Sequence, residues 1–387
     1  MRNIKLSLTF LLLFLTVIGL FFLEINNNNI ERQALIKAKV IGTDDSDVIQ
    51  SSIARIGMQE LTVRILEDKH QGEQVVAYNT LQGKPSLDNY YNVGDTILVA
   101  LQEQDNKLVN ANAVDMYRNN WEIILFALFV LLLLIYAKSI GIKAIFSFIA
   151  SLYIIWKFLI PGLLAGYNPL LFSTLILLIL SAIILFSIAG FTKKGLASFI
   201  GTVVGLMAAS GIAVIFGNKM SLQGMTVPYA ETLLFSGNIG LDMKHIFYAA
   251  IVIGASGAAM DIAMDISASM EEIKIKKPDI ELWELIRSGF NVGRAVIGTM
   301  TTTLLLAYSG GYLTLMMLFL SQNTSYTRML NYKVVAAELL RIVTGSIGLV
   351  LVAPITAIVA GWIYTVELRD IKVKKMISDF SKNYKVK

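Results

Sequence analysis

Long apolar runs dominate the sequence from Trp121 onward and restrict what the chain can fold into. A helix that crosses a lipid bilayer needs about 20 mainly apolar residues. Seven runs approach or exceed this length, and we predict membrane spans near residues 121–137, 143–164, 169–190, 196–216, 245–267, 295–320 and 335–365.

Residues 1–23 join a basic start to an apolar run that ends at Leu23. A cleavable signal peptide has a similar outline, but no small-residue cleavage pattern appears before Asn26. We therefore interpret this segment as an uncleaved N-terminal membrane anchor. Together with the other runs, it predicts a polytopic α-helical membrane protein with about eight transmembrane helices.

The composition agrees with a membrane protein, because 55% of the 387 residues are hydrophobic and only 16% are charged. The absence of cysteine excludes disulfides, zinc–thiolate sites and iron–sulfur clusters. The net charge of +5 arises from short basic runs beside apolar segments, which fits membrane orientation better than nucleic-acid binding. No phosphate-binding glycine loop ends in Gly-Lys-Ser/Thr, so we expect no cofactor, and we predict no metal site.

A polar segment, residues 24–119, follows the anchor and contains 14 acidic against 9 basic residues. It holds β-rich runs at residues 34–40, 60–66, 74–78 and 96–101, with turn residues at 42–45 and 93–95. This pattern predicts a small extracytoplasmic β-rich domain after the first helix. The predicted division is an anchor at 1–23, a β-rich domain at 24–119, a seven-helix membrane domain at 120–368 and a basic tail at 369–387.

The basic residues predict the orientation of the chain. With eight spans, one side of the membrane collects the basic clusters at residues 138–143, 193–194, 274–294 and 369–387. That side is predicted to be the cytoplasm, because cytoplasmic loops carry an excess of Lys and Arg. Both termini are then cytoplasmic and residues 24–119 are extracytoplasmic. Residues 276–294 mix apolar and charged positions and predict an amphipathic helix on the inner membrane face.

The candidate functional residues lie in the span between Ile251 and Glu272. Asp261 and Asp265 are four residues apart, so their carboxylates project from the same side of a helix that is otherwise rich in Gly and Ala. An ionised Asp near the bilayer centre costs about 2.5–3.5 kcal/mol on insertion scales. The two acids therefore need a cationic partner, a proton or bound water, and we predict that they couple proton or ion movement.

The following spans supply candidate partners. Thr301, Thr302 and Thr303 are candidate relay residues, and Asn291 and Arg294 are expected at the depth of Asp265 if the two helices are antiparallel neighbours. A contact between Asp265 and Arg294 would indicate a structural ion pair, and its absence a titrating site.

The last span adds Glu338 and Arg341, three residues apart, as a possible intramembrane pair.

Four stretches of the sequence resemble the YibE/F-like family of bacterial membrane proteins: VGDTILV, GASGAAMDIAMDIS, GTMTTTLLLAYSGG and GSIGLVLVAPITA. The resemblance implies a multi-pass protein of the bacterial cytoplasmic membrane, in a family described mainly as membrane proteins or permeases. A fainter similarity is to SecD/SecF and the resistance-nodulation-division transporters, which use an intramembrane acid in proton coupling.

We interpret the chain as a membrane permease or exporter, coupled to protons through Asp261 and Asp265, although these acids fit a cation such as sodium as well. The alternative is a non-transporting envelope scaffold or accessory protein that acts through its extracytoplasmic domain. No enzyme activity is expected, because both acids lie on one helix, whereas hydrolytic acid pairs converge from different elements. Expected partners are the lipid bilayer, an unidentified small-molecule or ion substrate, and a partner subunit or second copy.

Overall fold

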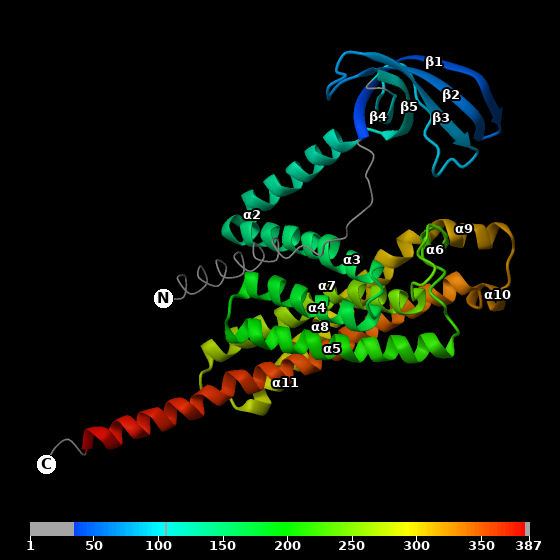
Figure 1. Ribbon diagram of the computed structural model, residues 1–387. Coiled ribbons are helices and arrows are strands. Elements are labelled where there is room, and N and C mark those ends of the chain that lie inside the picture. Colours follow the sequence, from blue (N-terminus) through cyan, green and yellow to red (C-terminus); the bar gives the residue numbers. More distant parts are fainter. Residues whose placement is uncertain (1–34, 105–106, 384–387) are drawn as a thin grey trace. The chain divides into compact units, whose positions relative to one another are not determined.

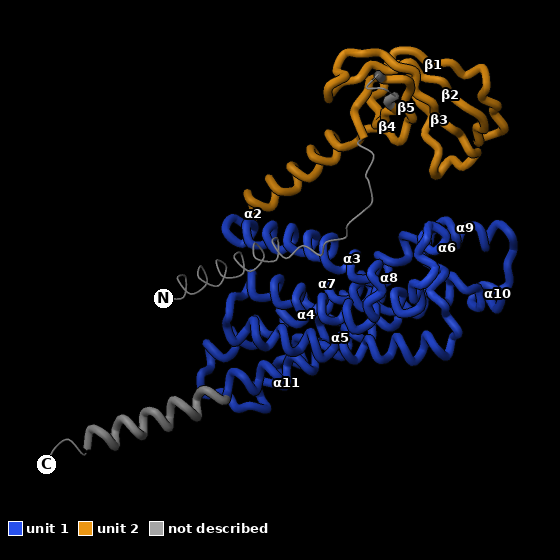
Figure 2. The backbone as a smooth tube through the Cα atoms, viewed as in Figure 1, with its two compact units in different colours: residues 1–27, 137–387 blue, residues 28–136 orange. Residues whose placement is uncertain are grey.

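The computed structural model of the protein describes residues 35–104 and 107–383, with side chains for residues 35–102 and 108–365. The chain divides into two compact units, and along the sequence the boundary lies between Tyr136 and Ala137 (Figure 2). The predicted anchor at 1–23 lies outside the described residues, as do the side chains of the predicted basic tail at 369–387.

One unit contains a closed five-stranded β-barrel (Figure 1). Around the barrel the strands follow the order β1-β2-β3-β5-β4, and only β3 and β5 pair in parallel. Closure removes the free strand edges that would otherwise pair with other chains. The strands are β1 (Leu35–Ser51), β2 (Ala54–Ile65), β3 (Gln74–Gln82), β4 (Thr96–Gln104) and β5 (Lys107–Met116).

Alternation of apolar residues builds the core of the barrel. Leu61, Val63 and Ile65 of β2 are buried, whereas the residues between them are exposed. Successive side chains on a strand point to opposite faces, so each strand contributes every second residue to the interior.

Two details of the barrel were not predicted correctly. Residues 42–45, predicted as a turn, lie within β1, where the pairing register shifts between Val40 and Gly42 and again between Asp44 and Asp47. Such bulges bend a strand without ending it. The strand β5 was missed, because Asn110 and Asn112 lower its β-propensity although β4 pairs with it along most of its length.

A buried glutamine fixes the chain before β4 to the barrel. The Gln59 amide donates to the Tyr91 carbonyl at 2.8 Å, and its oxygen accepts from Asn79 at 3.1 Å and from the Tyr91 N–H at 3.2 Å. Tyr91 is itself buried, and this burial raises the pKa of its phenol to about 12. The network holds Tyr91 in the core despite its position in an irregular segment.

The rest of the described chain is helical, and no sheet outside the barrel is formed by the described residues. The elements are α2 (Asn119–Ile154), a π-helical turn η1 (Ile155–Leu159), α3 (Ile160–Leu164), α4 (Pro169–Ala189), α5 (Lys193–Lys219), α6 (Ala230–Phe235), α7 (Met243–Lys276), α8 (Leu282–Gly311), α9 (Leu313–Ser321), α10 (Tyr326–Leu330) and α11 (Lys333–Asn383).

Polar N-caps set where three of the long helices begin. The side chains of Asn168, Thr192 and Asp242 accept a hydrogen bond from the backbone N–H three residues later, at the starts of α4, α5 and α7. Each bond satisfies one of the amide groups that a helix leaves free at its first turn. Burial raises the pKa of Asp242, but hydrogen bonds from His245 outweigh it and hold that pKa below its usual value.

The spans at the start of the membrane region form one helical run, Asn119–Leu164, of 46 residues. At about 1.5 Å per residue this run is about twice as long as the bilayer core is thick. Lys138 has a non-helical backbone (φ 48°, ψ −120°) that divides the run where two spans were predicted.

The next difference concerns residues 276–320. The predicted surface helix at 276–294 is the first half of α8, which continues unbroken to Gly311. The predicted span at 295–320 is instead broken at Tyr312, where α8 and α9 meet at 65°. Leu285 and Ile286 are buried against other helices, so the first half of α8 is a packed element as well as an amphipathic one.

Within the described residues, five helices are long and apolar enough to cross a membrane, and the bent pair α8–α9 makes a sixth if it acts as one span. The protein is therefore a mostly helical chain with membrane-length apolar helices and a small β-domain before them.

Small residues allow the closest helix contacts. Gly201, Gly205, Ala209, Ala213 and Gly217 recur every four residues on α5 and are buried. This ridge packs against α11 and α7, and small residues at such spacing let two helix backbones approach closely.

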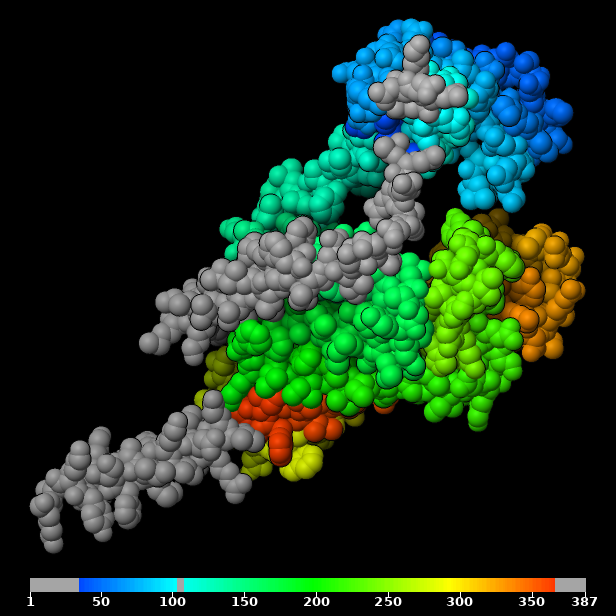
Figure 3. Space-filling view, in the orientation of Figure 1, coloured from blue at the N-terminus to red at the C-terminus, as the bar shows by residue number. Residues whose placement is uncertain are grey.

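The helix connections gather at two ends of the helical unit (Figures 1 and 3). The segment containing α6 lies beside α9 and α10 at one end. The turn from α7 to α8 and the start of α5 lie at the opposite end. The basic connections at 193–194 and 274–277 are thus together, at the end opposite α6, α9 and α10.

We expect Gly201→Ala to destabilise the helical unit. An added Cβ would lie 2.0 Å from Thr356 Oγ1 and 2.9 Å from its Cα, so the helices would have to separate. Overpacking of this kind costs about 1–3 kcal/mol. Gly211→Ala on the same helix is the matched control, because no atom lies within 4 Å of its added Cβ. Thermal unfolding in detergent, followed by circular dichroism, should show a lower melting temperature for Gly201→Ala alone; equal melting temperatures would contradict this packing.

We also expect Gln59→Leu to loosen the segment between β3 and β4. The substitution removes the acceptor of the Tyr91 N–H and one of the two acceptors of the Asn79 amide, at about 1–3 kcal/mol for each buried group left unpaired. Limited proteolysis should cut residues 83–95 faster than in the wild type. Gln74→Leu, at an exposed position of β3, is the control and should leave the rate unchanged.

Candidate functional site

The helix α7 is surrounded by other helices and packs against α4, α5, α8 and α11. Most of its circumference is buried, including Ala255, Ile262 and Ile266 in the main core cluster. A narrow stripe remains exposed, and we call it the α7 stripe. Its exposed members are Ala250, Gly254, Gly257, Asp261, Asp265 and Glu272.

Both candidate acids lie in this stripe. Neither Asp261 nor Asp265 forms a hydrogen bond or an ion pair with another residue in the described part of the chain. Their side chains are only one helical turn apart, so two ionised carboxylates would repel each other. The site therefore consists of two unpaired acids in the middle of an otherwise apolar helix.

The neighbouring helix α8 brings the predicted partners to the same level without forming the predicted contact. The two helices run antiparallel, with Gly289 packed on Met270 and Gly293 packed on Ile266. This register places Arg294 near the level of Asp265. No ion pair joins them, and Arg294 and Asn291 are exposed on α8.

Open space lies beside the acids. A Cβ built on Gly257 of α7 or on Gly298 of α8 would meet no atom within 4 Å. One turn beyond Gly257, the hydroxyl of Tyr308 lies 2.9 Å from the position of a Cβ on Gly254. The α7 stripe is therefore uncovered at Gly257, and Tyr308 of α8 lies over it at Gly254.

The three threonines of α8 differ in their hydrogen bonds. Thr302 and Thr303 donate to carbonyls of their own helix, Gly298 and Thr299, which is a common arrangement for hydroxyls in membrane helices. The Thr301 hydroxyl oxygen is buried and has no hydrogen-bond partner. Of the three threonines, Thr301 is thus the one whose hydroxyl group can still form a hydrogen bond.

Glu338 and Arg341 do form a pair. Glu338 Oε2 lies 3.4 Å from an Arg341 guanidinium nitrogen, and only 7% of the Glu338 surface is exposed. Tyr312 lies within interaction range of both side chains. The pair is next to the break between α8 and α9.

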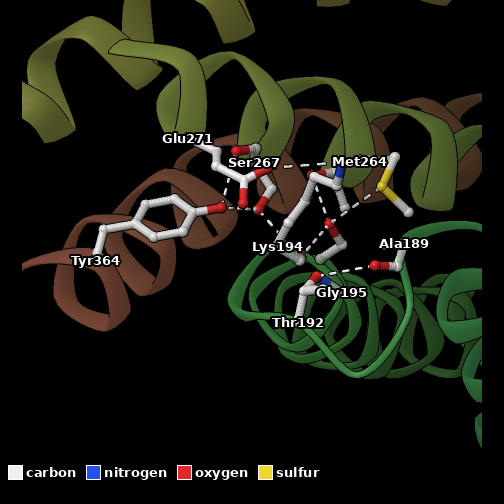
Figure 4. A network of polar contacts seen from close by, with 10 residues as sticks. Ala189, Thr192, Lys194, Gly195, Met264, Ser267, Glu271 and Tyr364 are labelled. Atoms are coloured by element: carbon white, nitrogen blue, oxygen red, sulfur yellow. Dashed lines mark hydrogen bonds and ion pairs between the residues drawn. The ribbon is translucent and has the colours of Figure 1, made fainter. Parts of the chain in front are cut away.

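A second polar cluster joins α5, α7 and α11 near the basic end of the unit (Figure 4). The hydroxyls of Ser267 and Tyr364 are 3.0 Å apart, and each also bonds to a backbone carbonyl, of Lys194 and Ser267 respectively. Lys194 Nζ lies 3.7 Å from Glu271 Oε2. These polar contacts thus join three helices within about two turns of Asp265.

The sequence analysis missed this cluster. Ser267 and Glu271 are four residues apart on α7, which is a weak signal for a shared face. Tyr364 offered no signal, because its distance from Ser267 along the chain is large and only helix packing brings them together. Tyr308 and Tyr312 were missed for the same reason.

Among the described residues no group of three or more His, Cys, Asp or Glu is placed to hold a metal ion. The arrangement on α7 and α8 can accept and release protons, or hold water between two carboxylates and a hydroxyl.

Comparison with known proteins gave two matches. A family model described as "YibE/F-like protein" matches residues 125–366, and one described as "YibE/F family N-terminal domain" matches residues 32–116. No curated protein and no solved structure matches the chain. The fainter similarity to SecD/SecF and the resistance-nodulation-division transporters receives no support from these comparisons. The two family matches cover both the β-barrel and the membrane-length helices, and the chain belongs to the YibE/F-like family.

Proposed function

We propose that this protein is a permease or exporter of the bacterial cytoplasmic membrane, coupled to protons through Asp261 and Asp265. The proposal depends on one observation above all. The two acids occupy the exposed stripe of an otherwise packed helix, and neither has a cationic partner within the described chain.

The position of Asp261 and Asp265 determines the free-energy cost of ionising them. Each ionised Asp at the bilayer centre would cost about 2.5–3.5 kcal/mol, and no ion pair with Arg294 offsets this cost. The stripe must then be hydrated, or at least one acid must carry a proton. Mutual repulsion favours a state in which the two carboxylates share one proton. Such a site can take up a proton from one side and release it to the other.

The open space beside the α7 stripe is compatible with water next to the two acids. Gly257 and Gly298 leave room for water, and the free hydroxyl of Thr301 lies on the neighbouring helix. Thr301 is the threonine we assign to water orientation, because Thr302 and Thr303 are bound to their own helix.

We further propose the complete topology: eight spans with the anchor at 1–23, both termini in the cytoplasm and residues 24–119 outside. Two features support it. The backbone break at Lys138 divides the first long run in two, and the basic connections lie together at one end of the helical unit.

A second candidate function is a non-transporting envelope scaffold, and the β-barrel supports it. The hairpin of β1 and β2 carries Ile49 and Ile56 opposite each other, exposed by 71% and 51%, with Ile53 exposed by 86% at the tip. Exposed apolar clusters of this kind mark protein-binding surfaces. Under this reading the barrel binds a partner protein and the helices act as its anchor.

We expect Asp261→Asn and Asp265→Asn to abolish proton flux in proteoliposomes under an imposed pH gradient. Each amide removes a titrating group from the shared site, and a loss of at least about tenfold is the effect typical of a general acid or base. Glu272→Gln is the matched control, because it makes the same change on the same stripe near the end of α7 and should retain flux. Undiminished flux in both Asp variants would exclude the proposed coupling.

Deletion of residues 24–119 separates the two candidate functions. The helical unit is compact without the barrel, so we expect a transporter to keep measurable flux after the deletion. A scaffold would show no flux in either form and would lose capture of its partner on deletion.

A further inference from the structure

The buried pair Glu338 and Arg341 has hydrogen-bonding capacity that the protein does not use. Glu338 Oε1 and Arg341 Nε are both buried, and neither has a hydrogen-bond partner. The 3.4 Å contact between the two side chains is also longer than the 2.7–2.9 Å or so of a charge-assisted hydrogen bond. A buried ion pair normally satisfies its remaining polar atoms, so these two atoms are available to a ligand that enters beside them.

The surroundings of the pair are aromatic and hydroxylated. Arg341 lies 5.9 Å from the centre of the Phe247 ring of α7. Tyr308 of α8 and Tyr312 at the α8–α9 break are the titratable groups from neighbouring elements that interact with the pair, and Tyr312 is also within hydrogen-bonding reach of both side chains. Tyrosine hydroxyls are hydrogen-bond donors at neutral pH, so a ligand beside Arg341 would meet a cation and two further donors.

This donor set fits an anion. A guanidinium presents parallel N–H groups that match the two oxygens of a planar monovalent anion, and the Nε–H of Arg341 is unoccupied. The Glu338 carboxylate now stands where such an anion would bind. An external anion can replace it only when Glu338 no longer carries its own negative charge.

Protonation of Glu338 provides that change without leaving an unbalanced charge. One proton adds to the Glu338 carboxylate, and one anion takes its place beside the Arg341 guanidinium. The net charge of the site is zero before and after, because the proton and the anion enter together. Direct replacement without the proton would place two negative charges beside one buried cation, which the apolar surroundings oppose.

We propose that Glu338 and Arg341 form a proton-gated binding site for a small monovalent anion, in which protonation of Glu338 releases Arg341 to bind the anion. The site rests on the proposed function, since it names small anions as the substrate class and makes them enter with a proton. Tyr308 lies between the pair and the acids, because it interacts with Glu338 and Arg341 and its hydroxyl reaches Gly254, seven residues or about two turns along α7 from Asp261.

The test measures nitrate binding to the purified full-length protein by isothermal titration calorimetry. Nitrate is planar and keeps its single charge over the whole range from about pH 5 to about pH 8, so any pH dependence belongs to the protein. Ionic strength is held constant with the bulkier anion gluconate. For the wild type, we expect binding at the acid end. Above the pH at which Glu338 loses its proton, the affinity should fall by up to about tenfold per pH unit.

Three variants test whether the pH-dependent binding of nitrate arises at Glu338 and Arg341. Glu338→Gln should bind nitrate equally well at both ends of the range, because the amide cannot ionise. The double variant Glu338→Gln/Arg341→Gln should bind none, and it removes both charges, so no unpaired buried charge threatens folding. Glu272→Gln should bind nitrate as the wild type does, because Glu272 is exposed near the end of α7 and lies outside the anion site.

Absence of nitrate binding in the wild type, pH-independent wild-type binding, pH-dependent binding in Glu338→Gln, or binding that survives in the double variant would each overturn the proposal. Failure of the proposed function has a different signature. It appears as absent proton flux, or flux indifferent to Asp261→Asn and Asp265→Asn, whatever the result with nitrate.

Discussion

Close contact between α5, α7 and α11 is the constraint on which the helical unit depends. The small residues of α5, such as Gly201 and Gly205, remove the side chains that would keep the helices apart. Once α11 and α7 have packed against this ridge, and α4 and α8 against α7, the α7 stripe is the part of α7 that the described residues leave uncovered. The position of Asp261 and Asp265 is therefore a consequence of packing. Any other rotation of α7 would bury the two acids in an apolar core, and burying an unpaired charge costs much free energy.

Ionisable groups in the helical unit fall into two physical classes. Toward the ends, charges are paired across or along helices, as in Lys194 with Glu271 and Glu338 with Arg341. Along the middle of α7 they are unpaired. Pairing stabilises a charge until another ion takes the place of its partner, whereas an unpaired acid in an apolar setting changes its protonation state readily.

The β-barrel forms its core in a different way from the helical unit. Its strands bury one face by simple alternation and close on themselves, so its apolar core consists of residues of the barrel domain alone. Both units belong to one family pattern, since family matches cover each of them. The hairpin of β1 and β2 adds an exposed apolar cluster to the barrel.

The sequence by itself determined that the chain is a membrane protein and which family it belongs to. Apolar length revealed the membrane helices, and the spacing of Asp261 and Asp265 placed both acids on one face, because helical periodicity is a local property. It also anticipated the β-domain, but not β5, whose residues are weak strand formers stabilised by pairing with β4.

Only the tertiary structure decided which groups meet. The sequence placed Arg294 near the level of Asp265, yet helix rotation leaves the two without an ion pair. It gave no sign that Tyr364 would bond to Ser267, or that Tyr308 would lie over Gly254. These contacts depend on the relative rotation and depth of whole helices. Packing sets both quantities, and no short segment of the chain encodes them.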